Sequence, residues 1–201
     1  MSHKAKIDLD LALKTNRPVI VELGCGPKKV AGAIGIDRLD LPQVDVVADL
    51  EAGLPFLPDN SVDEIVAVHS LEHLENFEGI MREIVRVLKP GGVCKVAVPH
   101  YSNPFAYSDY THKRFFGLYT FYYFVDPEFQ LHRRVPNYGD DLRIRVTKVR
   151  LIFRQHKRLL RLLAPLFEYV VNLCWLSQEW YEVKPWGIWC DEIRVEFTPV
   201  K

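Results

Sequence analysis

One short apolar segment constrains the fold of this chain more than any other feature, and it spans Val19 to Gly26. It begins with β-branched residues, which favour a β-strand, and it ends in an acid, Glu22, followed closely by Gly24 and Gly26. A short apolar run bounded by glycines is typical of a buried strand in a parallel sheet. Because glycine has no Cβ, these two residues let a ligand approach the backbone where the strand must turn. The sequence therefore predicts a core strand that ends at a ligand site.

Two classes of ligand use a strand, a glycine turn and an acid in this arrangement: dinucleotides and S-adenosylmethionine. A dinucleotide site needs a third glycine, a long helix facing the pyrophosphate, and an acid about 20 residues further on. Here Lys29 takes the place of the third glycine, and the next apolar run, 33–37, begins too soon for a full crossover helix. S-adenosylmethionine has no phosphate, and its positive charges favour a nearby carboxylate such as Glu22. The spacing thus indicates the methyl donor.

Further motifs follow along residues 17–100. They are Glu22-x-Gly24-x-Gly26, Gly35-Ile36-Asp37, Ala48-Asp49-Leu50, Leu71-Glu72-His73 and the segment 86–92 with its Pro90-Gly91-Gly92 end. In this order they resemble the motifs of class I S-adenosylmethionine-dependent methyltransferases, and most of all the small type-11 group. The resemblance implies an α/β fold with a Rossmann-like, seven-stranded mixed sheet, here with a shortened first helix, and S-adenosyl-L-methionine as the cofactor.

The resemblance also implies roles for residues at the strand ends. Asp37 would accept hydrogen bonds from the ribose hydroxyls, Asp49 and Leu50 would flank the adenine, and His69 would line the cofactor site beside Glu22, Gly24 and Gly26. For the aspartates, the alternative is a capping or turn role. His73 is expected to be structural, and the four scattered cysteines indicate neither a metal site nor a disulfide framework.

The remaining elements are predicted from periodicity and punctuation. Residues 44–49, 62–68 and 93–98 are expected to be strands, and the charged N-terminal stretch from Ser2 to Lys6 is expected to begin a helix. Asn76 is placed to cap a helix whose apolar positions recur at intervals of three and four residues until Pro90-Gly91-Gly92 ends it. Ligands in open α/β sheets bind beyond the carboxyl ends of the strands, where the acids and glycines above fall.

The segment from His100 to Phe116 follows the fifth strand and is rich in polar and aromatic residues. Its position predicts the acceptor pocket, with His100, Asp109 or His112 able to take a proton from an acceptor hydroxyl. The alternative is a tyrosine-rich loop that packs on the sheet with its polar tips satisfied.

The last third of the chain has a break in its pattern and then a helical stripe. Apolar residues change parity between Val146 and Val149, which predicts a bulge near Thr147. An apolar stripe from Leu159 to Cys174 predicts a helix, kinked or restarted at Pro165, inserted before a last strand at 188–199. Core packing or a lid is expected for this helix. A membrane-surface helix is the alternative, because basic residues stand at its start, and it is too short to span a bilayer.

At 201 residues and 48% apolar content, the chain is expected to form one domain, 1–201, with a cofactor-binding core at 17–100 and acceptor-side segments at 100–201. Without a secretory apolar core at its start, a cytoplasmic address is expected. Ten Lys or Arg against two acids between Arg133 and Arg161 favour an anionic small-molecule or glycan acceptor. The predicted function is methyl transfer to an oxygen or nitrogen of this acceptor. The alternatives are an RNA methyltransferase and a non-catalytic protein that binds S-adenosylmethionine.

Overall fold

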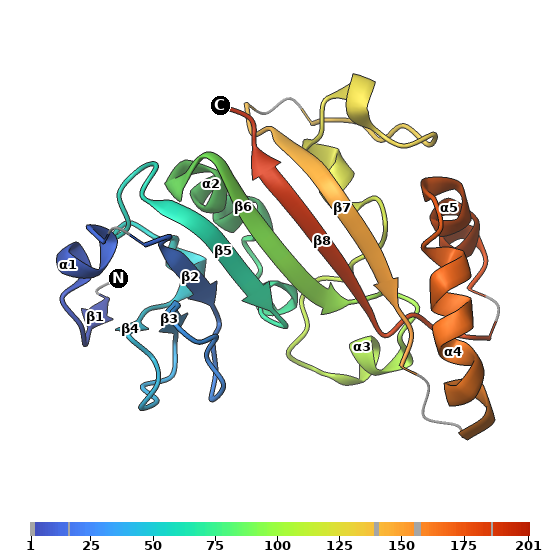
Figure 1. Cartoon of the computed structure of the whole chain (residues 1–201), viewed down its shortest axis with the longest axis horizontal. Helices are drawn as coiled ribbons and strands as arrows, with labels where there is room; N and C mark the ends of the chain where they lie inside the picture. Colours follow the sequence, from blue (N-terminus) through green and yellow to red (C-terminus); the bar gives the residue numbers. More distant parts are fainter. Residues whose placement is uncertain (1–2, 16, 139–140, 155–157, 186) are drawn as a thin grey trace.

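The computed structural model describes residues 3–15, 17–138, 141–154, 158–185 and 187–201, with the side chains of 158–161 outside the description. Within these residues eight strands form one sheet, in the order β1-β4-β3-β2-β5-β6-β8-β7 (Figure 1). The strands are β1 Lys4–Ala5, β2 Ile20–Leu23, β3 Ile34–Asp37, β4 Val46–Val47, β5 Val62–Val68, β6 Leu88–Pro99, β7 Ile144–Ile152 and β8 Glu192–Pro199. The helices and 3-10 turns are α1 Leu9–Leu13, η1 Leu50–Ala52, η2 Leu71–His73, α2 Phe77–Val87, α3 Pro104–Ser108, η3 Thr120–Phe124, η4 Pro127–Phe129, α4 Arg158–Val171 and α5 Trp175–Val183.

The sheet is mixed, as the resemblance implied. Strands β4, β3, β2, β5 and β6 run parallel to one another, whereas β8 pairs antiparallel with both β6 and β7. Strand β6 belongs to the predicted cofactor core and β8 to the last third of the chain, so the two parts share one sheet. Because β4, β3, β2, β5 and β6 are parallel, their carboxyl ends lie at one edge of that sheet.

The sheet has one strand more than the seven predicted. The extra strand is β1, which pairs antiparallel with β4. The N-terminal stretch had been expected to be helical, but Lys4 and Lys6 both pair with Asp40, at N–O distances of 2.9 and 2.5 Å. These ion pairs hold the segment extended, and helix α1 begins only after the N-cap Asp8. The prediction of a helix at Ser2 to Lys6 was wrong for its described residues.

The link between β2 and β3 also differs from the prediction. A shortened helix was expected there, but residues 24–33 contain only turns and bends. Two backbone bonds accompany the turn, from the amides of Gly24 and Cys25 to the carbonyl of Ile36. With about ten residues available, a helix and two connecting loops do not fit, so the chain crosses to β3 by turns alone.

Helix α2 follows its prediction closely. The Asn76 side chain accepts a hydrogen bond from the Gly79 amide at 3.0 Å and caps the helix. Its buried face is Ile80, Met81, Ile84 and Val87. It ends at Val87, before Pro90, because proline has no amide hydrogen to continue the ladder.

Strands β7 and β8, and the segment between them, confirm two further predictions. The register of β7 against β8 shifts between Val146 and Lys148, which is the predicted bulge at Thr147. Helices α4 and α5 lie between β7 and β8 in sequence and stand beside β7 at the edge of the sheet, as Figure 1 shows at right. Phe153 packs edge-on against Phe167 of α4 and Tyr181 of α5, with ring centroids 5.0 Å apart in both pairs. The helical insertion is therefore joined to the sheet by an aromatic cluster.

Candidate functional site

A cavity of about 320 Å³ lies at the carboxyl ends of β2, β3, β4 and β5. Six of the seven residues predicted to bind the cofactor line it: Gly24, Gly26, Asp37, Asp49, Leu50 and His69. They are brought together because parallel strands end at one edge of the sheet. The other lining residues are Arg38, Leu39, Ala48, Glu51, Ser70, His73, Leu74 and Thr111.

The glycine turn needs its glycines for two different reasons. Gly24 has φ +68°, and a Cβ there would lie 2.5 Å from the Cβ of Ser70, so a side chain is excluded by both backbone and neighbour. Gly26 has φ +51°, and a Cβ there would meet nothing within 4 Å. The turn is thus closed at Gly24 and open at Gly26, where a ligand can approach the backbone.

Asp37 ties the ends of two strands together. Its Oδ2 accepts from the Gly26 amide at 2.8 Å, and its Oδ1 accepts from the Leu39 amide at 2.9 Å. Each carboxylate oxygen has a second lone pair, so Asp37 keeps capacity to accept from a ligand hydroxyl. The carboxylate therefore positions the glycine turn and faces the cavity.

Glu22 does not line the cavity. Its side chain is buried beneath the turn, where Oε2 accepts from the Val30 amide at 2.5 Å, and burial raises its pKa. Here the prediction of a direct cofactor contact departs from the structure. Because the β2–β3 link has no helix to satisfy its amides, the carboxylate is used to hold the loop.

The far end of the cavity has apolar and acidic character. Asp49 caps the short turn η1 by accepting from the Glu51 amide at 3.0 Å, so the capping role weighed from the sequence is present. Leu50 follows it and is mostly buried, with Ala48 and Leu74 nearby in the lining. A flat apolar ring with an exocyclic amine fits such a pocket, with the amine donating to Asp49.

His69 stands at the end of β5 in an unusual environment. It is a non-glycine residue with φ +50°, and its ring lies between Glu192, 3.3 Å from Nε2, and Glu72, 3.4 Å from Nδ1. The hydrogen bond to Glu192, with a second to Glu72, raises the pKa of His69 to about 9. The imidazole is therefore cationic at neutral pH. A left-handed backbone at an element end is often a functional position.

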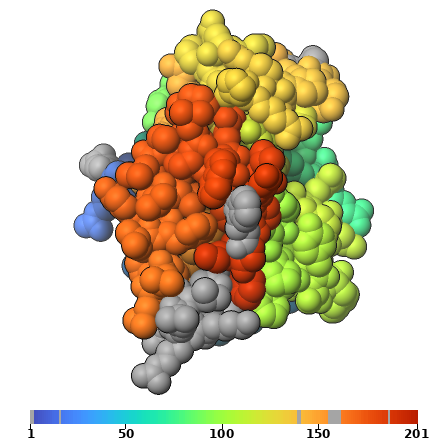
Figure 2. Space-filling view, turned by 90° about the vertical axis from the view of Figure 1, so that its right-hand side faces the viewer, coloured from blue at the N-terminus to red at the C-terminus, as the bar shows by residue number. Residues whose placement is uncertain are grey.

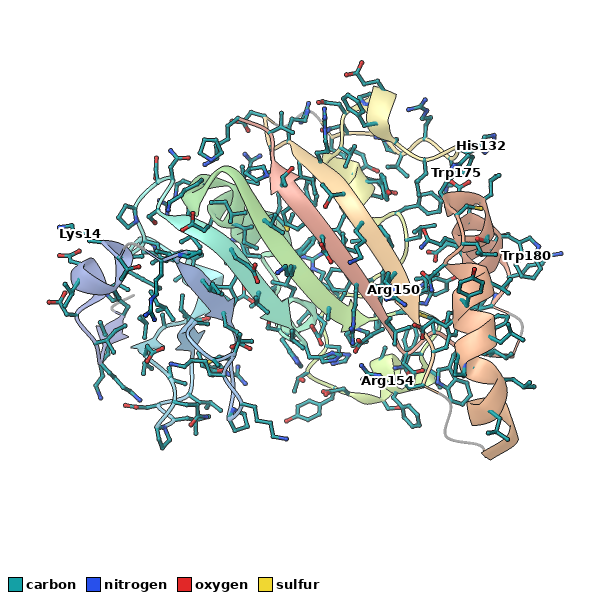
Figure 3. All side chains as sticks on the ribbon, viewed as in Figure 1. Lys14, His132, Arg150, Arg154, Trp175 and Trp180 are labelled. Carbon is teal, nitrogen blue, oxygen red and sulfur yellow. The ribbon has the colours of Figure 1, made fainter. Side chains whose placement is uncertain are left out.

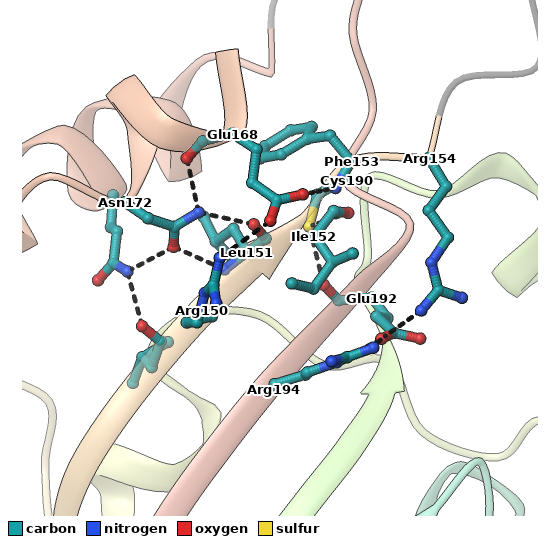
Figure 4. Close-up of polar contacts among 12 residues, drawn as sticks. Arg150, Leu151, Ile152, Phe153, Arg154, Glu168, Asn172, Cys190, Glu192 and Arg194 are labelled. Atoms are coloured by element: carbon teal, nitrogen blue, oxygen red, sulfur yellow. Dashed lines mark hydrogen bonds and ion pairs between the residues drawn. The ribbon is translucent and has the colours of Figure 1, made fainter. Parts of the chain in front are cut away.

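Glu192 gathers further cations around the same point. Burial raises its pKa, but the hydrogen bonds from His69 and Arg194 outweigh burial and lower that pKa to about 2. Arg194 lies 2.5 Å and Arg154 3.2 Å from its Oε1, as Figure 4 shows for the two arginines. No sequence pattern predicted a role for Glu192, because it lies in β8, far along the chain from every motif.

On the opposite wall, Thr111 and His73 contribute polar atoms. The Nδ1 atom of His73 lies 3.0 Å from the Thr111 hydroxyl. Thr111 falls inside the predicted acceptor segment, although it was not singled out there. The buried hydroxyl of Ser70, next in sequence to His69, has no hydrogen-bond partner among the described residues. Ser70 itself lines the cavity, although its hydroxyl oxygen is buried.

The three predicted catalytic residues are placed differently from one another. Asp109 and His112 lie together beside the cavity, with Oδ2 and Nε2 3.6 Å apart, but neither lines it. Asp109 is occupied by the Thr111 hydroxyl and amide, and these bonds lower its pKa. His112 is held through Nδ1 by the Ala106 carbonyl at 2.8 Å.

His100 is a correction to the predicted acceptor pocket. Its side chain is 0% exposed, with Nε2 3.0 Å from Glu182 and Nδ1 2.8 Å from the Ser102 hydroxyl. No acceptor can reach this ring. It joins the end of β6 to α5, and the prediction failed because the inserted helix that seals it was not foreseen at this position.

A metal ligand set was not expected, yet one cluster has suitable atoms. Glu72, His73 and His112 place one ligand atom each within 4.8 Å of one another. Glu72 is 1% exposed, and its Oε2 has no hydrogen-bond partner among the described residues. Glutamate and histidine are among the residue types that bind zinc.

Comparison with known proteins finds partial matches to methyltransferases. Residues 28–96 match the family model described as a methyltransferase domain. A Mycolicibacterium smegmatis protein named as a probable S-adenosylmethionine-dependent methyltransferase is 36% identical over 98 residues, covering 40% of this chain and 38% of its own. The trans-aconitate 2-methyltransferase of an Azoarcus species is 32% identical over 121 residues, covering 50% of this chain and 45% of its own. This chain thus spans less than half the length of these curated relatives.

The fold is shared more widely than the sequence. A methyltransferase structure from Archaeoglobus fulgidus, described as dependent on the same methyl donor, superposes with a TM-score of 0.56 at 14% identity. The match covers 94% of this chain and 89% of that one. At this identity the similarity concerns the fold alone.

Proposed function

We propose that this chain is a class I S-adenosylmethionine-dependent methyltransferase that transfers a methyl group to an oxygen or nitrogen of an anionic small molecule or sugar. The observation that supports this most strongly is the cavity in which Gly24, Gly26, Asp37, Asp49, Leu50 and His69 converge. These residues follow four separate strands, and the shared edge of the sheet brings them together around one cavity.

The cavity fits the cofactor by the chemistry of its walls. Asp37 accepts from the ribose hydroxyls, Leu50 covers a face of the adenine, and Asp49 accepts from its amine. The open backbone at Gly26 receives the polar tail. When bound, S-adenosylmethionine supplies an electrophilic methyl carbon, and the transfer leaves S-adenosylhomocysteine and releases the acceptor's proton.

An anionic acceptor is favoured by the cations around Glu192. His69, Arg154 and Arg194 all contact this one buried carboxylate, and their side chains are 46%, 60% and 49% exposed. Glu72 is the second acid beside His69, so three cations face two carboxylates, and the excess positive charge is available to a further anion. The trans-aconitate methyltransferase is a relative named for an anionic acceptor.

His73 is the imidazole placed to take the acceptor's proton. It lines the cavity, and Thr111 holds its Nδ1, which leaves Nε2 for the acceptor. His69 is cationic at neutral pH and Asp109 has a lowered pKa, so both are poor bases there. His73 thus replaces His100, Asp109 and His112 as the proposed base.

Calorimetry tests the cofactor site. S-adenosylhomocysteine should bind saturably, and Asp37→Ala should weaken its binding by about tenfold or more, because a hydrogen bond to a charged group contributes about 1.5–3 kcal/mol. Asp10→Ala, an exposed acid of α1, is the matched control and should bind as the wild type does. An Asp37→Ala variant with full affinity would remove this carboxylate from the site.

An acceptor screen tests the reaction itself. S-adenosylhomocysteine formation should be faster with hydroxy acids and sugar acids than with their neutral amides, and Arg194→Gln should raise the KM for the acids alone. RNA methylation is the second enzyme reading, favoured by the basic last third of the chain. It would be marked by activity on RNA that falls steeply with salt. Cofactor binding without turnover on any acceptor would indicate the non-catalytic alternative.

A further inference from the structure

The outward side of helices α4 and α5 is apolar. On α4 and the turn after it, the exposed side chains are Leu162, Leu163, Leu166, Tyr169, Val170 and Leu173. On α5 they are Trp175, Leu176, Trp180 and Val183. We call these residues the α4–α5 face. Figure 2 looks directly at it, and the two helices form a continuous orange and red surface there. Exposed apolar patches of this extent usually mark an interaction site.

The polar residues of the same helices point the other way. Glu168 of α4 accepts from the Phe153 amide at 3.0 Å and pairs with Arg150, and Asn172 bonds to both backbone groups of Leu151 (Figure 4). On α5, Gln178 donates to the Val149 carbonyl at 3.0 Å.

The acids of α5 follow the same rule. Glu179 accepts from the buried hydroxyl of Tyr119 at 2.8 Å, and Glu182 lies 3.0 Å from His100. The described acids of both helices are therefore turned inward, which is the reverse of a water-facing surface helix. This arrangement indicates that the α4–α5 face has an apolar environment in its working state.

Basic residues border the α4–α5 face. His132 stacks near Trp175 with ring centroids 6.4 Å apart, and Arg134 lines a hollow with the same tryptophan. Figure 3 shows His132, Trp175 and Trp180 together at one side of the molecule. Arg150 and Arg154 pair with Glu168 and Glu192. In sequence, residues 150–161 hold five Lys or Arg and no acid. An apolar surface with tryptophans and a basic border is suited to the headgroup region of an anionic bilayer.

We propose that the α4–α5 face docks in the plane of an anionic lipid bilayer. Among the described residues no helix is long and apolar enough to cross a membrane, and α4 and α5 have 14 and 9 residues. A symmetric pairing of two copies through this face would bring like-charged borders together, which electrostatics opposes. Lipid headgroups of opposite charge meet the border favourably.

Vesicle binding tests the proposal on the wild-type protein. It should sediment with vesicles of phosphatidylcholine and phosphatidylglycerol, and much less with phosphatidylcholine alone. Tryptophan emission should shift to the blue on binding, because Trp175 and Trp180 leave water. Raising the ionic strength to about 1 M, where the Debye length is about 3 Å, should weaken the binding. Absence of binding to the mixed vesicles at low salt would overturn the proposal.

A matched pair of variants locates the binding surface. Leu166→Glu should weaken vesicle binding by about tenfold or more, since the free energy of burying one leucine side chain corresponds to at least that change in affinity. Leu11→Glu on α1 is the control, because Leu11 is 69% exposed and Leu166 is 64% exposed. Near-ultraviolet circular dichroism checks that both variants fold.

Two results would count against the proposal at this step. One is a folded Leu166→Glu variant that binds vesicles as tightly as Leu11→Glu. The other is a wild-type dimer, seen by light scattering, that Leu166→Glu makes monomeric while vesicle binding is absent. Both readouts are independent of methyl transfer.

Discussion

At the scale of single residues, the cluster of His69, Glu72 and Glu192 is the least ordinary feature of the cavity. A half-exposed imidazole lies between two buried carboxylates, and its backbone has a positive φ. Glu192 comes from β8, whereas His69 and Glu72 follow β5, so the cluster depends on the order of strands in the sheet. Its charge state decides whether His69 attracts an anion or accepts a proton.

The His69 cluster makes stability depend on pH in a defined window. The pKa of His69 is raised to about 9 in the folded protein, above the value of about 6.5 expected when unfolded. Its contribution to the free energy of unfolding is therefore fully present below about pH 6.5 and is lost as the pH rises through about 9. Urea unfolding across this range should show the decline in the wild type and a flatter profile in His69→Gln.

Titration by NMR measures the same effect directly. Glu192→Gln should bring the pKa of His69 down, since the hydrogen bond to this carboxylate is the largest cause of the increase. A wild-type His69 that titrates near its ordinary value would contradict the placement of its ring between the two acids.

At the scale of elements, Asn172, in the turn after α4, hydrogen-bonds to the outer edge of β7. Its Oδ1 accepts from the Leu151 amide at 2.9 Å, and its Nδ2 donates to the Leu151 carbonyl at 2.7 Å. Strand β7 is the last in the sheet order, so among the described residues Leu151 has no neighbouring strand on the side away from β8. The side-chain amide takes the place of that strand, which blocks further edge pairing and anchors α4.

Loss of this amide should destabilise the fold by a measurable amount. Asn172→Leu leaves the Leu151 donor and acceptor without their partner, at a cost of about 1–3 kcal/mol for each group that stays dry. Asn172→Asp keeps the acceptor but turns a carboxylate oxygen toward the carbonyls of Leu151 and Glu168, so it should be destabilised as well. Urea unfolding gives both values, and a variant as stable as the wild type would mean that water replaces the amide.

At the scale of the whole molecule, the link between β2 and β3 bears on the class of ligand that the cavity can bind. The cavity is formed by turns, with no described helix between β2 and β3 whose N-terminus could face a phosphate. Dinucleotides depend on such a helix, whereas S-adenosylmethionine carries no phosphate.

A thermal-shift panel checks this selectivity. S-adenosylhomocysteine at about 100 times its Kd should stabilise the fold by about 2.7 kcal/mol, and NAD and FAD at the same concentration should leave the melting temperature unchanged. NAD giving a shift as large as that of S-adenosylhomocysteine would argue against the cofactor assignment.

The sequence by itself determined most of the strands, the glycine turn and most of the cavity. Gly24, Gly26, Asp37, Asp49 and Leu50 could be placed because each follows a strand pattern, and strand patterns are local. The capped helix α2 and the bulge at Thr147 were foreseen for the same reason, since both depend on residues within a few positions of each other.

Only the tertiary structure decided the roles of the titratable groups. His100 and His69 both follow a strand, yet helix α5 seals the first, whereas the second stays half-exposed beside Glu192. Glu22 was turned from the cofactor to the Val30 amide because the link above it has no helix. Burial and charge depend on contacts between residues distant in sequence, so periodicity and spacing carry no record of them.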